Sequence, residues 1–379
     1  MKHNPLLELE TLGQSIWVDF IRREMIASGE LQQLIKEDGV SGVTSNPSIF
    51  EKAFTESHDY DEAIRALALK GMTSDEIYQS LTLEDIQNVA DLLLPTYHLM
   101  DGRDGFVSLE VSPGLAHDTT GTIAEARQLW SVIKRPNAMI KVPATSEGLP
   151  AIRQLTAEGI NINITLPFGL PRYEDVADAY IGRLEILAAK RKPLAHVVSV
   201  ASFFLSRIDV LIDPVLENKI KTDSLQARIA SRLQGQIAIA SAKVAYQMYR
   251  EIFSSDRFSK LVNSGARTQR LLWASTSTKN PADSDTKYIE ALIGPDTVNT
   301  VPIETLNAYR DHGHPEQRLD QKVPEAYQLL NKLGAVGIDL NAVTQRLEAE
   351  GVDKFVAAFN RLIASLKEKG AAMQGVHQR

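Results

Sequence analysis

The sequence predicts an α/β protein built as a closed (β/α)8 barrel with helical insertions and C-terminal helices, and three observations support this fold class. Eight short apolar runs rich in β-branched residues recur along the chain. Helix-like stretches separate these runs, as expected for parallel strands joined by crossover helices. No Gly/Ser linker, low-complexity stretch or internal repeat interrupts residues 1–379, so we expect a single domain. An open eight-stranded sheet is the structural alternative.

The predicted strands are short and apolar, and each is bounded by polar or turn-forming residues. They cover residues 16–20, 39–43, 106–111, 138–142, 160–166, 196–201, 271–275 and 298–302. A TIM barrel of this kind places its active site at the C-terminal ends of the strands. Polar residues at those ends are therefore the first candidates for function.

The predicted helices are unevenly distributed, with insertions at about 51–105 and 206–265. The first insertion carries two helical patterns, around 59–69 and 82–100, and Thr82 followed by Glu84 and Asp85 is typical of an N-cap with an acidic first turn. The predicted elements of the later part of the chain are one long amphipathic helix over 224–253 and C-terminal helices over 324–333 and 340–367, within about 324–370, packed around the barrel.

The overall charge makes nucleic acid and anionic membranes poor candidates as partners. The chain has 41 basic and 48 acidic residues, a net charge of −7, and no basic tract. Phosphorylated substrates would need positive charge concentrated in a pocket. With no cysteine, thiolate catalysis, disulfides and cysteine-ligated metal centres are excluded. Since there is neither a signal-peptide pattern nor a long apolar run, we expect a cytoplasmic protein that does not span a membrane.

Four polar residues stand at the ends of predicted strands: Asp19, Glu110, Lys141 and Thr165. Alternate side chains of a strand face opposite sides, so Glu110 shares the barrel-facing side with Ser108 while the apolar residues between them face the helices. Each residue alone is more often a structural partner, and a Lys–Glu pair neutralises itself. Charges are costly inside a barrel, however, so the convergence of four such groups favours function.

A lysine at the mouth of a barrel has an evident chemical use. Desolvation disfavours the ammonium form, and the neutral amine can attack a ketone to form a Schiff base. The protonated Schiff base withdraws electrons, so that the adjacent carbon–carbon bond can break. Carboxylates and a hydroxyl nearby could shuttle the protons that this reaction requires.

Seven segments in register resemble the transaldolases of the longer, bacterial-type branch. The matching segments are GVTSNPSIFEKA at 42–53, FVSLEVSP at 106–113, MIKVPAT at 139–145, GININITL at 159–166, VASFFLSRID at 200–209, LLWASTSTKNP at 271–281 and DHG at 311–313. Each segment alone is weakly diagnostic, but together they cover nearly the whole chain.

The resemblance implies transfer of a dihydroxyacetone unit from fructose 6-phosphate or sedoheptulose 7-phosphate to erythrose 4-phosphate or glyceraldehyde 3-phosphate, within the non-oxidative pentose phosphate pathway. No cofactor and no metal are expected. By motif position, Lys141 is the Schiff-base lysine, Asp19 the acid/base, and Glu110 with Thr165 the pair that holds the catalytic water. The implied substrate-binding residues are Asn46, Asn163, Ser202, Arg207, Ser275 and Lys279.

Some of these residues have a structural alternative. Arg207 suits a phosphate through its planar fork, but a surface ion pair with Asp209 or Glu217 is the alternative. Lys279 follows the seventh strand, where barrel phosphate sites are common, yet it could be a solvated loop lysine. Asn46 precedes a proline and could instead form a turn.

Two features depart from the resemblance. The fifth strand is followed by Pro167-Phe168-Gly169, where many family members continue with Ile-Phe-Ser, so the acceptor preference and the rate stay open. Lys279 stands where some branches have an arginine, which trades bidentate recognition of phosphate for a point charge.

Three other functions remain open from the sequence. A fructose-6-phosphate aldolase is disfavoured because that branch lacks a glutamate at the position of Glu110 and uses a tyrosine near Phe204. A non-catalytic scaffold is disfavoured because all the expected polar groups are present. A metal-dependent aldolase is disfavoured because the chain has no HExxH pattern, and the HGH sequence at His312 and His314 is expected to be exposed loop structure. The sequence allows a monomer or a homodimer.

Overall fold

The computed structural model describes residues 4–222 and 224–375, and its eight strands form a closed parallel TIM barrel in chain order. The strands are β1 (Gln14–Val18), β2 (Val40–Thr44), β3 (Phe106–Glu110), β4 (Ala138–Pro143), β5 (Ile162–Thr165), β6 (Ser199–Phe204), β7 (Arg270–Ala274) and β8 (Thr297–Val301). β1 pairs with β8 over its whole length and so closes the ring, which rules out the open sheet. All eight predicted strands are confirmed, with ends shifted by a few residues.

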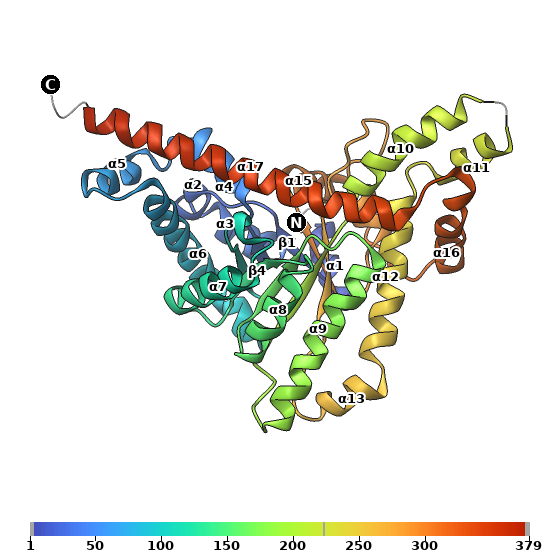
Figure 1. Ribbon diagram of the computed structural model, residues 1–379, viewed down its shortest axis with the longest axis horizontal. Helices are drawn as coiled ribbons and strands as arrows, with labels where there is room; N and C mark the ends of the chain where they lie inside the picture. Colours follow the sequence, from blue (N-terminus) through green and yellow to red (C-terminus); the bar gives the residue numbers. More distant parts are fainter. Residues whose placement is uncertain (1–3, 223, 376–379) are drawn as a thin grey trace.

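Helices surround the barrel, mostly as crossovers between consecutive strands (Figure 1). They are α1 (Pro5–Thr11), α2 (Arg23–Ala27), α3 (Glu30–Asp38), α4 (Pro47–Thr55), α5 (Asp61–Leu69), α6 (Ser74–Leu99), α7 (Thr119–Ile133), α8 (Gly148–Ala157), α9 (Leu170–Ala189), α10 (Ser206–Ile220), α11 (Leu225–Leu233), α12 (Ile237–Phe253), α13 (Asp256–Val262), α14 (Lys287–Ala291), α15 (Ile303–His312), α16 (Val323–Lys332) and α17 (Leu340–Gly375). Short 3-10 turns lie at η1 (Pro113–Leu115) and η2 (Gly334–Val336).

The predicted helix start at Thr82 is wrong. α6 begins at Ser74 and is capped by Thr73, whose side chain and that of Glu76 form a reciprocal capping box. Thr82 lies inside the helix, where its hydroxyl donates to the Tyr78 carbonyl at 2.8 Å. A threonine can satisfy its hydroxyl in either position, so the Thr-Leu-Glu-Asp pattern does not distinguish a cap from a helix interior.

The predicted single helix over 224–253 is also wrong, because it breaks into α11 and α12. Gly235 separates them with φ +67°, a left-handed conformation that glycine adopts readily. The Asp213 carboxylate accepts a hydrogen bond from the Gly235 amide at 2.9 Å, and Asp209 accepts one from the Ala238 amide at 2.8 Å. Two carboxylates of α10 thus cap the turn and the start of α12.

The N-terminal end of the barrel is closed by Trp17, which is fully buried. Its indole occupies the space beside Gly42, where a Cβ atom would lie 2.4 Å from the ring. The indole NH donates to Asp104 at 2.7 Å, and Arg270 lies 3.6 Å from the same carboxylate. These side chains fill the barrel axis at this end, and the pocket that holds most of the predicted site residues lies at the C-terminal ends of the strands.

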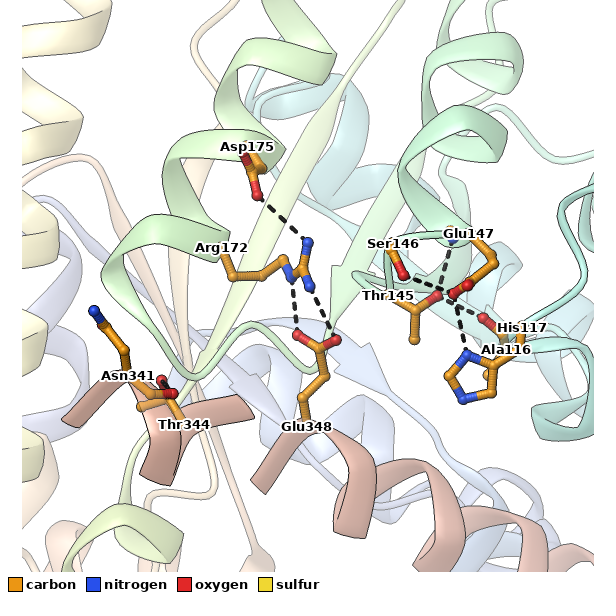
Figure 2. Close-up of polar contacts among 11 residues, drawn as sticks. Ala116, His117, Thr145, Ser146, Glu147, Arg172, Asp175, Asn341, Thr344 and Glu348 are labelled. Atoms are coloured by element: carbon orange, nitrogen blue, oxygen red, sulfur yellow. Dashed lines mark hydrogen bonds and ion pairs between the residues drawn. The ribbon is translucent and has the colours of Figure 1, made fainter. Parts of the chain in front are cut away.

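The two predicted C-terminal helices are confirmed as α16 and α17, and α17 packs across that open end of the barrel. In Figure 1 it is the long red helix running across the top of the molecule. Its first turns pack against the start of α9, where Arg172 binds Glu348 through two hydrogen bonds at 2.9 and 3.2 Å (Figure 2). Further along, Arg361 pairs with Glu51 of α4 at 2.5 Å.

Candidate active site

A pocket of about 320 Å³ lies at the C-terminal end of the barrel, beneath α17. Of the ten predicted site residues, seven line it: Asp19, Asn46, Lys141, Ser202, Arg207, Ser275 and Lys279. Glu110, Asn163 and Thr165 are buried in the strands below it. Strand alternation positions half of the predicted set, and the other half follows the C-terminal ends of strands; the strand residues are Glu110, Lys141, Asn163, Thr165 and Ser202.

Lys141 forms a buried ion pair with Glu110 on the neighbouring strand. The lysine Nζ lies 3.1 Å from Glu110 Oε2, and the two side chains are 4% and 3% exposed. Lys141 also donates to the Ser45 carbonyl, which follows β2, at 3.1 Å. Since β2 and β4 are not neighbours, this bond crosses the barrel interior and fixes the amine there. Burial raises the pKa of Glu110, and the charge of Lys141 opposes that rise.

Asp19 follows β1 directly and lies at the pocket, partly buried. Its Oδ1 accepts a hydrogen bond of 2.6 Å from the Thr44 hydroxyl, which in turn lies 2.7 Å from the hydroxyl of Thr300. Burial raises the pKa of Asp19, while Lys141, Thr44 and Arg207 favour its charged form and oppose that rise. A carboxylate with a raised pKa beside a buried amine suits an acid/base group.

A series of hydrogen-bonded polar side chains crosses the barrel interior near Lys141. Ser202 donates to Asn163 Oδ1 at 2.6 Å, and Asn163 donates to the Ser108 hydroxyl at 3.0 Å. These residues come from β6, β5 and β3, so the series passes inside the ring. Thr165 Oγ1 and Glu110 Oε1 are buried without a hydrogen-bond partner in the described part of the chain. Buried polar groups of this kind are suited to binding a ligand or a water.

Arg207 faces the pocket, and the proposed alternative of a surface ion pair is wrong. Asp209 instead accepts from the Tyr288 hydroxyl at 2.8 Å, and Glu217 accepts from Gln234 at 3.2 Å. Arg207 Nη1 is buried and donates to no group within the described residues. Its guanidinium lies 5.5 Å from the centre of the Phe204 ring, on the wall of the pocket. An unpartnered guanidinium donor in a pocket is suited to an anion.

Ser275 and Lys279 lie on the same wall as Arg207. Ser275 has φ +56° and its hydroxyl is 2.9 Å from that of Ser206, the first residue of α10. Lys279 is exposed at the rim and donates to Ser277 at 2.6 Å. Partial desolvation of its amine by the pocket wall, followed by the charges of Arg207 and Lys52, lowers the pKa of Lys279.

Asn46 caps a helix, as its alternative role predicted, and it also lies at the pocket. Its Oδ1 accepts from the Ile49 amide at 3.1 Å and caps α4, while the residue also lines the pocket. The 167–169 loop contributes indirectly: Phe168 packs against Phe204 with ring centres 5.0 Å apart. Gly169 caps α9 and is held closely, since a Cβ there would lie 2.7 Å from Thr344 Oγ1 of α17.

Sequence reasoning missed several pocket residues, namely Thr44, Ser48, Ile49, Lys52, Ala274, Thr276, Ser277, Thr300, Pro302 and Phe355. Thr44 and Thr300 could have been found from strand alternation, because each is at the C-terminal end of an inward-facing pattern. Lys52 lies on α4 and stands inside the quoted segment 42–53, so that segment already contained this residue. Nothing local marks Phe355, which depends on where α17 crosses the barrel.

Within the described part of the chain, no histidine lines this pocket. His312 is the last residue of α15 rather than part of a loop, and its Nε2 lies 2.9 Å from Asp285, whereas His314 is exposed after the helix. In residues 4–222 and 224–375, no group of three or more His, Cys, Asp or Glu side chains could hold a metal ion. Over the same residues, no helix has the length and apolarity needed to cross a membrane.

Comparisons with known proteins agree with this geometry. Residues 16–366 match the family model described as transaldolase/fructose-6-phosphate aldolase. A protein of Nostoc sp. strain PCC 7120 named Transaldolase 2 is 47% identical over 375 residues, 97% of this chain and 98% of that protein. A protein of Saccharopolyspora erythraea named Transaldolase is 47% identical over 373 residues, 97% and 99% of the two chains. One of Mycobacterium tuberculosis with the same name is 46% identical over 363 residues, 95% and 96%.

Proposed function

Because the chain belongs to the transaldolase family and acts on sugar phosphates as a transaldolase, we propose that its pocket performs this reaction through a Schiff base on Lys141. The supporting observation is the buried contact between Lys141 Nζ and Glu110 at 3.1 Å, beside a pocket that also holds Asp19 and Arg207. The pocket and this contact together bring a nucleophile, acid/base groups and an anion-binding donor into one place.

The first step is attack of the Lys141 amine on the ketone carbon of the donor. The carbinolamine that forms must lose water to become an iminium ion, and this requires a proton for the departing hydroxyl. Glu110 lies 3.1 Å from the amine and has a free oxygen, and Thr165 has an unpartnered hydroxyl. These two groups hold the water that relays the proton.

The second step is cleavage of the bond between C3 and C4. Asp19 takes the proton of the C4 hydroxyl, the C3–C4 electron pair moves toward the iminium nitrogen, and C4 leaves as the aldehyde carbon of an aldose phosphate. The remaining three-carbon enamine stays on Lys141. Its hydroxyls are bound by Asn46, Asn163 and Ser202, which lie at or just below the pocket. Attack of the enamine on an acceptor aldehyde reverses these steps, and Asp19 returns the proton.

The phosphate of the donor or acceptor binds at the pocket wall that carries Arg207, Ser275 and Lys279. Arg207 supplies two donors in a fixed plane, Ser275 a hydroxyl, and Lys279 a charge at the rim. The net charge of the chain is −7, so this local cluster must provide the attraction for an anionic substrate. The proposed donors are fructose 6-phosphate and sedoheptulose 7-phosphate, and the acceptors erythrose 4-phosphate and glyceraldehyde 3-phosphate, as in the non-oxidative pentose phosphate pathway.

Borohydride reduction with fructose 6-phosphate tests the nucleophile. The iminium should be reduced to a stable three-carbon adduct, which peptide mapping should find on Lys141. Lys243 is a matched control, because it is also buried but donates to the Arg318 and Gln321 carbonyls at 2.7 Å. An intact protein without an adduct, or an adduct on Lys243 instead, would contradict the proposed mechanism.

Acceptor dependence separates transfer from simple cleavage. Glyceraldehyde 3-phosphate release from fructose 6-phosphate should rise strongly when erythrose 4-phosphate is added, since the enamine is otherwise left on the lysine. Equal rates with and without the acceptor would favour the aldolase. We further propose that the enzyme acts in the cytoplasm as one domain spanning 1–379, with the insertions and C-terminal helices completing the barrel, and as a monomer or a homodimer.

A further inference from the structure

The ring of Phe355, on α17, lies near both Lys141 and Arg207 in the pocket. Its centre is 5.8 Å from Lys141 Nζ and 5.9 Å from the Arg207 guanidinium carbon. The residue is 3% exposed and lines the pocket. One apolar side chain therefore covers the nucleophile and reaches the phosphate-binding group.

α17 holds this ring in a fixed position, because charged pairs tie the helix down on both sides of it. Before the ring, Glu348 is bound by Arg172 of α9, which also contacts Asp175 at 3.4 Å (Figure 2). After the ring, Arg361 binds Glu51 of α4 through two hydrogen bonds at 2.5 and 3.0 Å.

The helix also packs closely against the pocket one turn before the ring. Gly351 is buried, and a Cβ atom there would lie 2.9 Å from Leu166 Cδ2 and 3.7 Å from Arg207 Nη1. Leu166 follows β5 with φ +67°. Because Gly351 has no side chain, α17 can pack closely against the C-terminal end of the barrel. This close packing places Phe355 over the amine of Lys141.

We propose that Phe355 is a specificity-determining residue that keeps water away from the enamine on Lys141 and so favours transfer over hydrolysis. This inference rests on the proposed Schiff-base mechanism. After cleavage, the enamine must persist on Lys141 while the first aldose phosphate leaves and the second enters. The apolar ring of Phe355 over the enamine nitrogen excludes water from it during that interval.

The competing reaction consumes a proton and a water. Protonation of the enamine carbon forms an iminium, and attack of water on its C2 gives a carbinolamine. The C2–N bond then breaks, so that dihydroxyacetone leaves with the water oxygen as its ketone oxygen and Lys141 is regenerated as ammonium. No oxidant or reductant is needed. Transfer instead forms a carbon–carbon bond to the acceptor aldehyde, so the ratio of dihydroxyacetone to sedoheptulose 7-phosphate reports the partition of the enamine.

The experiment compares variants of Phe355 with a matched aromatic control on the same helix. Phe359 lies one turn further on and packs edge-on against Tyr78 with ring centres 5.2 Å apart, outside the pocket lining. Phe355→Ala removes the cover, Phe355→Val removes less volume, and Phe355→Leu keeps apolar bulk without a ring. Phe359→Ala loosens the helix to a similar degree without opening the pocket.

Each folded variant is assayed with fructose 6-phosphate and erythrose 4-phosphate, and both products are quantified. For Phe355→Ala, the ratio of dihydroxyacetone to sedoheptulose 7-phosphate should rise about tenfold, which corresponds to about 1.4 kcal/mol in relative barrier. It should rise less in Phe355→Val and stay within about twofold of the wild-type ratio in Phe355→Leu and Phe359→Ala.

Three results would overturn the proposal. The ratio could stay unchanged in Phe355→Ala and Phe355→Val. It could rise equally in Phe359→Ala, which would indicate general loosening of α17, or equally in Phe355→Leu, which would assign the effect to the ring rather than to its apolar bulk. Borohydride trapping of the wild type keeps the two proposals apart. Without an adduct on Lys141 the Schiff-base mechanism fails, whereas an adduct with an unchanged ratio refutes only the role of Phe355.

Discussion

The ion pair between Lys141 and Glu110 predicts a strong energetic coupling in the folded protein. Both side chains are almost fully buried, so removal of one partner takes away the counter-ion that the other contacts. Breaking such a pair costs about 3–5 kcal/mol, a large share of the roughly 5–15 kcal/mol that stabilises a typical protein. Replacing both partners with apolar residues of similar size is often neutral.

We therefore expect Glu110→Leu to lower the free energy of unfolding by up to about 3–5 kcal/mol, because Lys141 loses its contacting carboxylate and keeps the hydrogen bond to the Ser45 carbonyl and the more weakly coupled charge of Asp19. Lys141→Met should lower the free energy of unfolding by less, because burial already raises the pKa of Glu110 and its carboxyl group can take up a proton. The double variant Lys141→Met/Glu110→Leu should be more stable than Glu110→Leu, with a coupling of about 3 kcal/mol.

Chemical denaturation of the wild type, the two single variants and the double variant at pH 7 measures this coupling. The solvent-exposed pair of Arg346 and Glu350 on α17 provides a control cycle, in which the two single effects should be additive because water screens the charges. If the two single effects simply add in the double variant, Lys141 and Glu110 do not interact in solution. The geometry proposed for the nucleophile would then be wrong.

Three further outcomes are expected. Burial raises the pKa of Asp19, so the acid limb of the pH profile of kcat/KM should lie above the ordinary aspartate pKa of about 3.9. Thr44→Val should move this limb to higher pH, because the Asp19 carboxylate loses a hydrogen bond. A limb that does not move would exclude Asp19 as the titrating base. Arg207→Lys should raise KM for fructose 6-phosphate by about tenfold or more while leaving turnover of unphosphorylated fructose unchanged, and equal losses for both would remove Arg207 from the phosphate site. Gly42→Ala should destabilise the barrel by about 2–3 kcal/mol in thermal or chemical unfolding, because its Cβ would meet the rigid Trp17 ring at 2.4 Å, and wild-type stability would contradict that close packing.

The barrel and most of its polar interior follow from short-range patterns in the sequence. The alternation in 106–110 predicts that Ser108 faces inward, and the structure places it in a hydrogen bond with Asn163 across the ring. Lys141 is likewise directed into the interior by its strand. Such patterns suffice because a parallel strand in a closed barrel has only two faces, one toward the axis and one toward the helices.

Features that depend on distant packing could not be predicted in this way. The break at Gly235 needs the carboxylate of Asp213 from another helix, and the start of α6 at Ser74 depends on a choice between two similar threonine patterns. Phe355 is an ordinary apolar residue on an amphipathic helix. Only the path of α17 across the barrel end makes it part of the pocket, and that path depends on partners such as Glu51, about three hundred residues earlier in the chain.

The position of α17 separates the cover of the pocket from the ring beneath it. All eight strands lie within residues 14–301, whereas α17 begins at Leu340, so no strand pairing of the ring depends on this helix. Parts of a folded protein can open locally at a lower free energy than the whole molecule unfolds. Local detachment of α17 would leave the amine of Lys141 in place but open to solvent, so the shelter of the reactive centre can be lost while the barrel stays folded.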